Sequence, residues 1–107
     1  MAISNIWPIM GILERTGFIG IPLIGPSPLQ VNFTDQSTGD ITSWEWNFGD
    51  GSPVSNDQNP DHSFANAGIY MVSLTVSGPL GSDAETKTDY ISVTRLNMGI
   101  YLLLLEY

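Results

Sequence analysis

Apolar and polar side chains alternate in several short runs of the chain. The runs LQVNFT at 29–34 and IYMVSLTV at 69–76 place an apolar side chain at every second position. Successive side chains of a strand point to opposite faces, so each run predicts a strand with one face in a core. Residues 83–93 predict a further strand, whose Ile91 and Val93 close that core. No helical periodicity competes between residues 29 and 94, which predicts an all-β domain.

The most informative run is the segment 41–48, in which three aromatic side chains recur at every second position. Trp44, Trp46 and Phe48 would share one face of a strand and bury a large apolar area. The tripeptide Gly49-Asp50-Gly51 follows at once. It predicts a tight turn, because glycine reaches positive φ without steric cost and aspartate can hydrogen-bond its own backbone.

Polar segments separate the predicted strands. Residues 35–40 and 65–68 are predicted turns, 52–60 is a predicted polar loop, and 77–82 is a predicted hairpin loop containing two glycines and a proline. The chain returns from the polar loop through NPDHSF at 59–64.

Three motifs occur in order along the chain: WNFGDG at 46–51, NPDHSF at 59–64, and GIY at 68–70 at the start of the alternating strand. Together they resemble the PKD domain, an immunoglobulin-like repeat in which an aromatic-rich strand runs into Phe-Gly-Asp-Gly. The resemblance covers about residues 26–94. It implies an antiparallel β-sandwich that serves as a scaffold and has no chemistry of its own.

The same resemblance implies roles for particular residues. The ring of His62 would hydrogen-bond a loop and support the core, and Tyr70 resembles the tyrosine corner of Greek-key sandwiches. The residues of the fold signature are Trp44, Trp46, Phe48, Gly49, Asp50, Gly51, His62, Phe64 and Tyr70.

The N-terminal segment 1–25 lies outside the resemblance. It is apolar but interrupted by prolines and glycines, and it lacks a basic region followed by an unbroken apolar stretch. It therefore fits neither a secretory signal nor a membrane-spanning helix. We expect an extended arm with strand-like pieces at 3–10 and 18–24. The arm either folds back as an extra strand on its own sandwich or packs on a neighbouring subunit.

The C-terminal segment 95–107 contains the continuous apolar run 100–105. Such a strand would template aggregation if it were left at an open edge, so a soluble protein has to cover it. The predicted division is thus an arm (1–25), a sandwich (26–94) and an apolar strand (95–107). The candidate subunit-interface residues are Trp7, Ile9, Phe18, Ile100, Leu102, Leu103, Leu104 and Leu105.

Charge and composition exclude several classes of function. The net charge is −8, and nine of the 11 acidic residues lie between Asp35 and Asp89 with Lys87 as the one base among them. This balance argues against nucleic acids and anionic membranes as partners. The chain has no cysteine, which excludes disulfides, thiolate metal sites and cysteine nucleophiles.

Few residues suggest chemistry. His62 is the single histidine, and the acids fall mainly in turns, so we expect neither a hydrolytic triad nor a glycosidase carboxylate pair. Asp57 and Asp61 begin like a calcium loop, but the glycine and the bidentate glutamate of that motif are missing. They are weak calcium candidates, and no cofactor is expected. Asn32 begins a glycosylation sequon on a predicted strand.

The sequence therefore predicts a non-enzymatic structural or interaction protein. The favoured hypothesis is a subunit of a multi-subunit assembly, a capsid decoration or tail component of a virion. Its partners would be other copies of itself or other structural proteins, and Leu103→Asp would abolish assembly. One alternative is a subunit of an extracellular filament or surface layer linked by strand exchange. Another is a substrate- or carbohydrate-binding accessory or adhesion module, outside the cell or at its surface.

Overall fold

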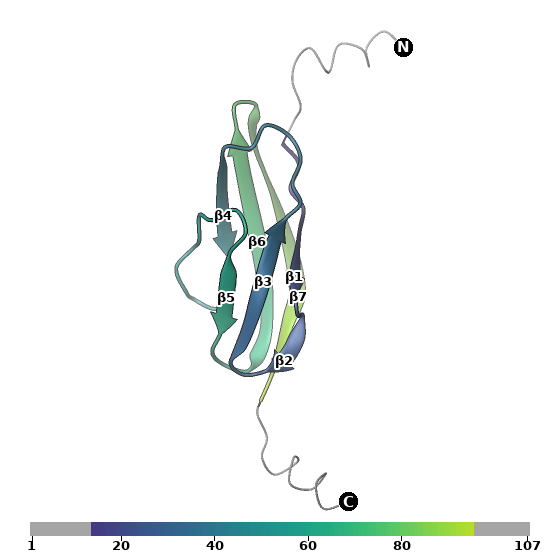
Figure 1. Cartoon of the computed structure of the whole chain (residues 1–107), viewed down its shortest axis with the longest axis vertical. Helices are drawn as coiled ribbons and strands as arrows, with labels where there is room; N and C mark the ends of the chain where they lie inside the picture. Colours follow the sequence, from purple (N-terminus) through teal and green to yellow (C-terminus); the bar gives the residue numbers. More distant parts are fainter. Residues whose placement is uncertain (1–13, 96–107) are drawn as a thin grey trace, which may run out of the picture.

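The computed structural model describes residues 14–95 and confirms the predicted β-sandwich (Figure 1). One sheet has the strand order β1-β3-β5, with bounds β1 Phe18–Ile21, β3 Leu29–Asp35 and β5 Asp61–Phe64. The other has the order β2-β7-β6-β4, with bounds β2 Ile24–Pro26, β7 Gly81–Thr94, β6 Gly68–Gly78 and β4 Ser43–Asn47. Within residues 14–95 there is no helix with the length and apolar character needed to cross a bilayer.

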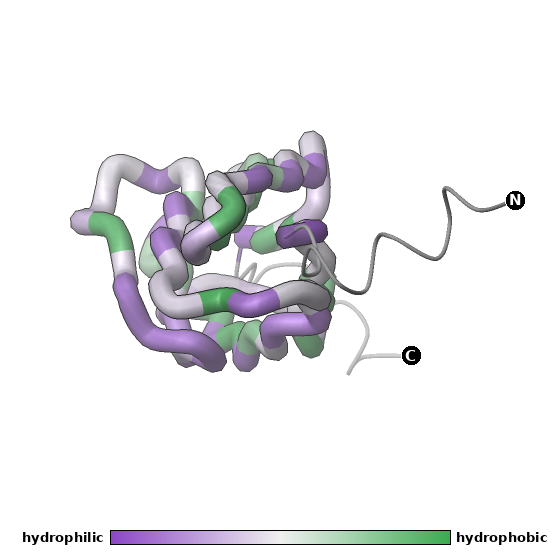
Figure 2. The backbone as a smooth tube through the Cα atoms, turned by 90° about the horizontal axis from the view of Figure 1, so that it is seen from above, coloured by the Kyte–Doolittle hydropathy of each residue, from purple (hydrophilic) through white to green (hydrophobic). Residues whose placement is uncertain are grey.

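The core lies between the two sheets and is centred on Trp46, which is fully buried. Its ring contacts those of Phe18 and Phe33, with centroids 5.1 Å and 5.4 Å away. Hydrophobic and hydrophilic residues are interspersed along the backbone (Figure 2). The buried apolar residues are Phe18, Leu29, Val31, Phe33, Trp46, Phe48, Phe64, Val72, Leu74, Val76, Ile91 and Val93.

The predicted strand at 18–24 is two strands in different sheets. β1 pairs with β3, whereas β2 pairs with β7 in the one parallel register of the described sheets. Pro22 and Leu23 carry the chain from one sheet to the other. Of the two fates expected for the arm, residues 14–25 therefore take the first and fold onto their own sandwich. The expected strand at 3–10 lies outside the described residues.

The hairpin between β6 and β7 is tighter than predicted. Gly78 pairs with Gly81, so only Pro79 and Leu80 lie between the strands. The pairing register of β6 with β7 also shifts near the start of β6, where Tyr70 faces Ile91 but Val72 faces Lys87. Three residues of β7 (88–90) then lie opposite one residue of β6, which is a β-bulge. Asp89 within it has φ 51°, in the left-handed region.

Candidate functional site

The turn after β4 is held by its own polar side chains. Gly49 has φ 74°, and its N–H donates to Asn47 Oδ1 at 2.9 Å. Asp50 Oδ1 accepts hydrogen bonds from the Ser52 N–H at 3.1 Å and from Ser52 Oγ at 2.5 Å. A side chain at Gly49 would overlap the carbonyl oxygen of Met71 on β6. Glycine is therefore required there both for backbone conformation and for space.

His62 on β5 reaches back to this turn. Its Nε2 lies 2.7 Å from Asp50 Oδ2, and its ring stacks on Phe48 with centroids 4.0 Å apart. Both polar side chains are mostly buried, with 16% and 14% of their surface exposed. Burial raises the pKa of Asp50, but hydrogen bonds from Ser52 and His62 outweigh it and hold the pKa below its ordinary value. The imidazole thus ties the turn to β5 and extends the aromatic core.

Asp50, His62 and Ser52 do not form a catalytic triad. Ser52 Oγ lies 3.5 Å from the same Nε2 that contacts Asp50. In a triad the serine and the carboxylate engage opposite nitrogens of the ring. Ser52 Oγ also donates to Asp50, which directs its proton away from the imidazole. This arrangement cannot activate the serine as a nucleophile, and it suits a structural role.

The loop 52–60 is bonded to the free edge of β4. Trp46 and Ser55 exchange two backbone hydrogen bonds of 2.8 Å and 3.1 Å. The indole N–H of Trp46 donates to the carbonyl of Asp57 at 2.9 Å, and the amide of Asn56 donates to the carbonyl of Trp44 at 2.9 Å. Backbone groups that another strand would use are therefore already paired.

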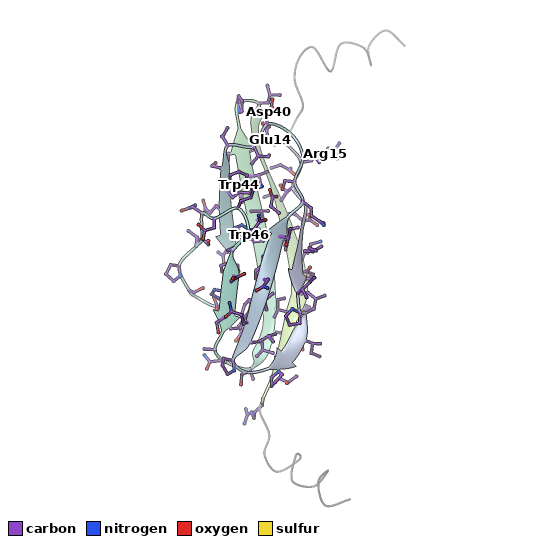
Figure 3. The ribbon with its side chains drawn as sticks, viewed as in Figure 1. Glu14, Arg15, Asp40, Trp44 and Trp46 are labelled. Atoms are coloured by element: carbon purple, nitrogen blue, oxygen red, sulfur yellow. The ribbon has the colours of Figure 1, made fainter. Side chains whose placement is uncertain are left out.

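Trp44 shares the inner face of β4 with Trp46 but lies nearer one end of the sandwich and is only half-buried (Figure 3). Its indole N–H donates to Asp35 Oδ2 at 2.8 Å. Burial raises the pKa of Asp35, but hydrogen bonds from Ser37, Trp44 and Gln58 together hold it below its ordinary value. Asp35, expected to open a turn, instead ends β3 and anchors this tryptophan.

Tyr70 and Phe64 complete the predicted fold signature. The Tyr70 hydroxyl donates to the carbonyl of Asn66 at 2.6 Å, four residues upstream, which is the bond expected of a tyrosine corner. Its ring lies 4.8 Å from that of the buried Phe64. The turn between β5 and β6 is thereby fixed to the core.

The calcium candidates do not belong to a cluster of acidic side chains. Asp57 is exposed in the loop, with its carbonyl engaged by Trp46, and Asp61 is exposed on β5. Residues 14–95 contain no group of three or more acidic, histidine or cysteine side chains close enough to hold an ion. Calcium also takes backbone carbonyls and waters, so a weak calcium site at Asp57 and Asp61 stays a prediction.

A second set of contacts, which the sequence did not predict, joins β1 to β7. Asp83 Oδ2 accepts the backbone N–H of Thr16 at 2.8 Å, and the Tyr90 hydroxyl accepts that of Gly20 at 2.9 Å. Lys87 Nζ lies over the ring of Phe18, 5.1 Å from its centroid. Such a position is favourable for a cation.

These contacts correct the prediction for Phe18. Only 2% of its surface is exposed, and its ring lies between Trp46 and Tyr90. It belongs to the core of its own sandwich and cannot serve as a subunit contact. The other seven candidate interface residues, Trp7, Ile9, Ile100, Leu102, Leu103, Leu104 and Leu105, lie outside the described residues.

Glu14 is a buried carboxylate that the sequence gave no reason to single out. It is 7% exposed, and within residues 14–95 its Oε2 has no hydrogen-bond partner; neither has the buried hydroxyl of Thr16. Glu14 and Asp40 lie at the same end of the sandwich (Figure 3). A side chain at Gly78 would overlap both the Asp40 carbonyl oxygen and Glu14 Oε2. Glycine at this position leaves room for the carboxylate.

Comparison with known proteins identifies the family. The sequence pattern described as "PKD domain" matches residues 25–93, which is more than half of the chain. The chain belongs to the PKD domain family. The match begins at β2 and ends within β7. β1 lies outside the matched residues and nearly all of β7 lies inside them, so the β1–β7 contacts join an unmatched strand to a matched one.

Two curated relatives match part of this sequence. The chain is 38% identical over 55 residues to "Collagenase ColA" of Bacillus cereus, covering 51% of this chain and 6% of the relative. It is 37% identical over 73 residues to "Pre-pro-metalloprotease PrtV" of Vibrio cholerae, covering 68% of this chain and 8% of the relative. The chain thus corresponds to less than a tenth of each.

Solved structures show the same fold. The PKD1 domain of Vibrio anguillarum Epp has a TM-score of 0.64 and 27% identity, with 78% of this chain and 99% of that chain covered. A structure titled for the promiscuous specificity of carbohydrate-binding modules from the β-sandwich superfamily has a TM-score of 0.71 and 26% identity. The likeness covers 80% of this chain and 36% of that one.

Proposed function

We propose that this PKD domain is a non-catalytic accessory module through which a larger extracellular hydrolase engages its polymeric substrate. The observation that carries the proposal is the small share of ColA and PrtV that the chain matches, 6% and 8%. A match of this size supports one module beside the protease machinery. Asp50 and Ser52 both contact the same nitrogen of His62, Nε2, and this arrangement supports a non-catalytic role.

This proposal replaces the virion hypothesis with the accessory-module alternative. The relatives reported above are proteases by name, and one similar structure is titled for carbohydrate-binding modules. None of them suggests a particle component. The same comparison supports an extracellular setting, because a collagenase acts on an extracellular protein.

The exposed side chains favour a polypeptide over a carbohydrate as the substrate. Sugar rings are commonly held against the flat faces of exposed aromatic side chains, which offer a large apolar area. Within residues 14–95 no Trp, Phe or Tyr side chain is exposed; Trp44, Tyr70 and Tyr90 are half-buried and the others are buried. The exposed large apolar side chains are aliphatic: Ile19, Ile21, Leu23, Ile24, Val54, Ile69, Met71 and Leu80.

A co-sedimentation experiment tests the proposal. The full chain is mixed with insoluble fibrillar collagen and, in parallel, with microcrystalline cellulose and with chitin, and the fraction left in the supernatant is measured. We expect depletion by collagen, reversed by soluble gelatin, and none by the polysaccharides. Hydrolysis is measured in the same samples by the release of new amino groups, and none is expected.

The outcomes are distinct. Depletion by a polysaccharide alone would replace the polypeptide with a carbohydrate substrate. No depletion by any polymer would contradict an accessory binding role. Equal depletion by all three would indicate non-specific adsorption and would also count against it.

A further inference from the structure

The outer face of the four-stranded sheet differs from the rest of the surface. The pairing registers place its side chains in rows across the strands. The row at the end where β7 leaves the sheet is Ile24–Ser92–Ile69. The rows toward the other end are Asn47–Ser73–Thr86, Glu45–Thr75–Ala84 and Ser43–Ser77–Ser82.

One end of this outer face is apolar. Ile24 and Ile69 are 63% and 64% exposed and flank the half-buried Ser92, and Met71, two residues along β6, is 49% exposed. We call Ile24, Ile69 and Met71 the apolar patch. Singly exposed apolar side chains are normal, but a row held together by strand pairing forms a continuous apolar surface that favours a contact.

The charge distribution indicates what can approach this face. The chain carries a net charge of −8, yet the four rows contain a single charged side chain, Glu45. Along the chain, Asp89 precedes Ser92 by three residues and Arg95 follows it by three, and their charges are opposite. Two like-charged copies repel each other except where the meeting surfaces lack charge. The outer face meets that condition, and it offers little to a strongly charged partner.

The size of the outer face suits a weak dimer. The sheet is at most three strands wide at any level, about 14 Å, because β2 and β4 flank opposite ends of it, and the 11 residues of β6 span about 36 Å along. The resulting area of roughly 500 Å² per copy, or about 1,000 Å² for the pair, lies in the range of weak, transient interfaces. Short serine, threonine and alanine side chains on the polar rows allow a second sheet to come close.

The edge strands of the sheets offer less opportunity for association than the outer face does. β4 is bonded to the loop 52–60, and two backbone donors on the β1 side are taken by Asp83 and Tyr90. β2 has only three residues, one of them Pro26, which has no N–H to donate. Edge-to-edge pairing at these three strands is therefore disfavoured, whereas the outer face of the four-stranded sheet has no such obstacle.

We propose that the outer face pairs with the same face of a second copy about a two-fold axis that passes near the apolar patch. In such an isologous contact each residue is used twice, so Ile24 and Ile69 of both copies form its centre. The second copy was among the partners predicted from the sequence, but the contact comes from the sandwich and does not require the chain ends. The proposal goes beyond the accessory role and is independent of it.

Sedimentation velocity and light scattering on the full chain test the proposal. We expect a monomer–dimer equilibrium within the range of about 10 μM to 1 mM that is typical of modest interfaces. Ile69→Lys should weaken dimerisation by at least ~100-fold, because a charge would be buried twice at the centre. Ile21→Lys is the matched control, since Ile21 is also 63% exposed but lies on β1 of the other sheet. It should leave the equilibrium unchanged.

Salt and a second variant make the test specific. Raising the ionic strength from about 0.05 M to 0.5 M should strengthen the dimer, because salt screens the repulsion between two copies of charge −8. Should Ile69→Lys melt early, Met71→Lys on the same patch takes its place. A chain that stays monomeric would overturn the proposal, whether its patch is bare or covered by another segment of the same chain. A dimer that neither patch variant weakens would overturn it too, as would an equal effect of Ile21→Lys. A dimer that salt weakens would also contradict it.

Discussion

The sandwich has two lateral edges, and they are closed in different ways. The signature edge consists of β4, β5 and the loop 49–60 between them. It is closed by backbone pairing of the loop with β4 and by the contact of His62 with Asp50, which lie 12 residues apart. The seam edge consists of β1 and β7. It is closed by side chains of β7 that bind the backbone of Gly20 in β1 and of Thr16 just before it, across 70 and 67 residues of sequence.

The difference explains why one edge was visible in the sequence and the other was not. At the signature edge the partners lie in one short stretch and require unusual residues, such as glycines at positive φ. At the seam edge the partners are an aspartate, a tyrosine and a lysine, residue types that occur on any surface. Closing such long loops also costs more chain entropy, so the seam edge has less local support. The following predictions test this comparison.

The largest effect is expected at the turn of the signature edge. Gly49→Ala would force a left-handed residue and push its Cβ into the carbonyl of Met71. We expect it to lower the free energy of unfolding by at least about 3 kcal/mol. Gly51→Ala is the control, because Gly51 also has positive φ, 82°, but nothing within 4 Å of its Cβ position. It should cost about 1 kcal/mol. Equal losses in denaturant titrations would mean that the overlap with Met71 is relieved without cost.

Removing one tyrosine hydroxyl at a time compares the two edges directly. Tyr90→Phe at the seam edge leaves the N–H of the buried Gly20 without its partner and should cost about 1.5 kcal/mol. Tyr70→Phe frees the carbonyl of the exposed Asn66, which water can satisfy, and should cost about 0.5 kcal/mol. Native-state hydrogen exchange would report the difference, because only Tyr90→Phe should accelerate exchange at Gly20. Unchanged protection there would argue that the seam does not depend on this bond.

Acid should weaken the signature edge more than the seam edge. The folded-state pKa of Asp50 is below its ordinary value, so its contribution is present above the unfolded-state pKa, near 4, and is lost as the pH falls through the folded-state value. Asp50→Asn should therefore cost about 1 kcal/mol at pH 7 and little near pH 2.

Asp83 provides the comparison for this experiment. The hydrogen bond from the backbone N–H of Thr16 lowers its pKa, but the carboxylate is exposed to solvent. Asp83→Asn should flatten the pH dependence of the melting temperature less than Asp50→Asn does. A larger effect of the seam variant would reverse the ranking of the two edges.

The smallest effect is expected from Glu14, at the end of the seam edge. Glu14→Gln removes the charge of a buried carboxylate whose Oε2 has no hydrogen-bond partner in the described part of the chain. It should raise the free energy of unfolding by about 0.5 kcal/mol. The measurement is a chemical denaturation at pH 7 with Glu14→Asp as a control that keeps the charge. A loss of stability in Glu14→Gln would show that the carboxylate is satisfied by a contact beyond the described residues.

The sequence predicted the fold where periodicity and turn chemistry agree. Alternation in 29–34 and 69–76 corresponds to β3 and β6, and the aromatic run corresponds to β4 and the residue Phe48 that follows it. It could not predict the break between β1 and β2, because the apolar pattern continues across Pro22 while the chain changes sheets.

The side chains of β7 show a second limit of the pattern. Asp83, Glu85 and Lys87 pair with the buried residues of β6, so they point to the inner side of the sheet. Polar residues at these positions predict an outward face, yet they lie at an open edge where solvent reaches the inner side. The bulge at 88–90 then brings Tyr90 against Phe18. The alternation of apolar and polar residues in the sequence indicates neither this open edge nor the bulge at 88–90.

The parallel pairing of β2 with β7 has a mechanical consequence. The described chain enters at one end of the sandwich and leaves at the opposite end (Figure 1). Tension on the two ends therefore pulls β2 and β7 in opposite directions along their own axes. The bonds from Ser92 N–H to Leu23 O and from Ser27 N–H to Thr94 O, both between 2.8 and 2.9 Å, would be strained together. A force applied along the polypeptide therefore loads the β2–β7 hydrogen bonds in shear. These bonds have to break simultaneously before the sandwich opens.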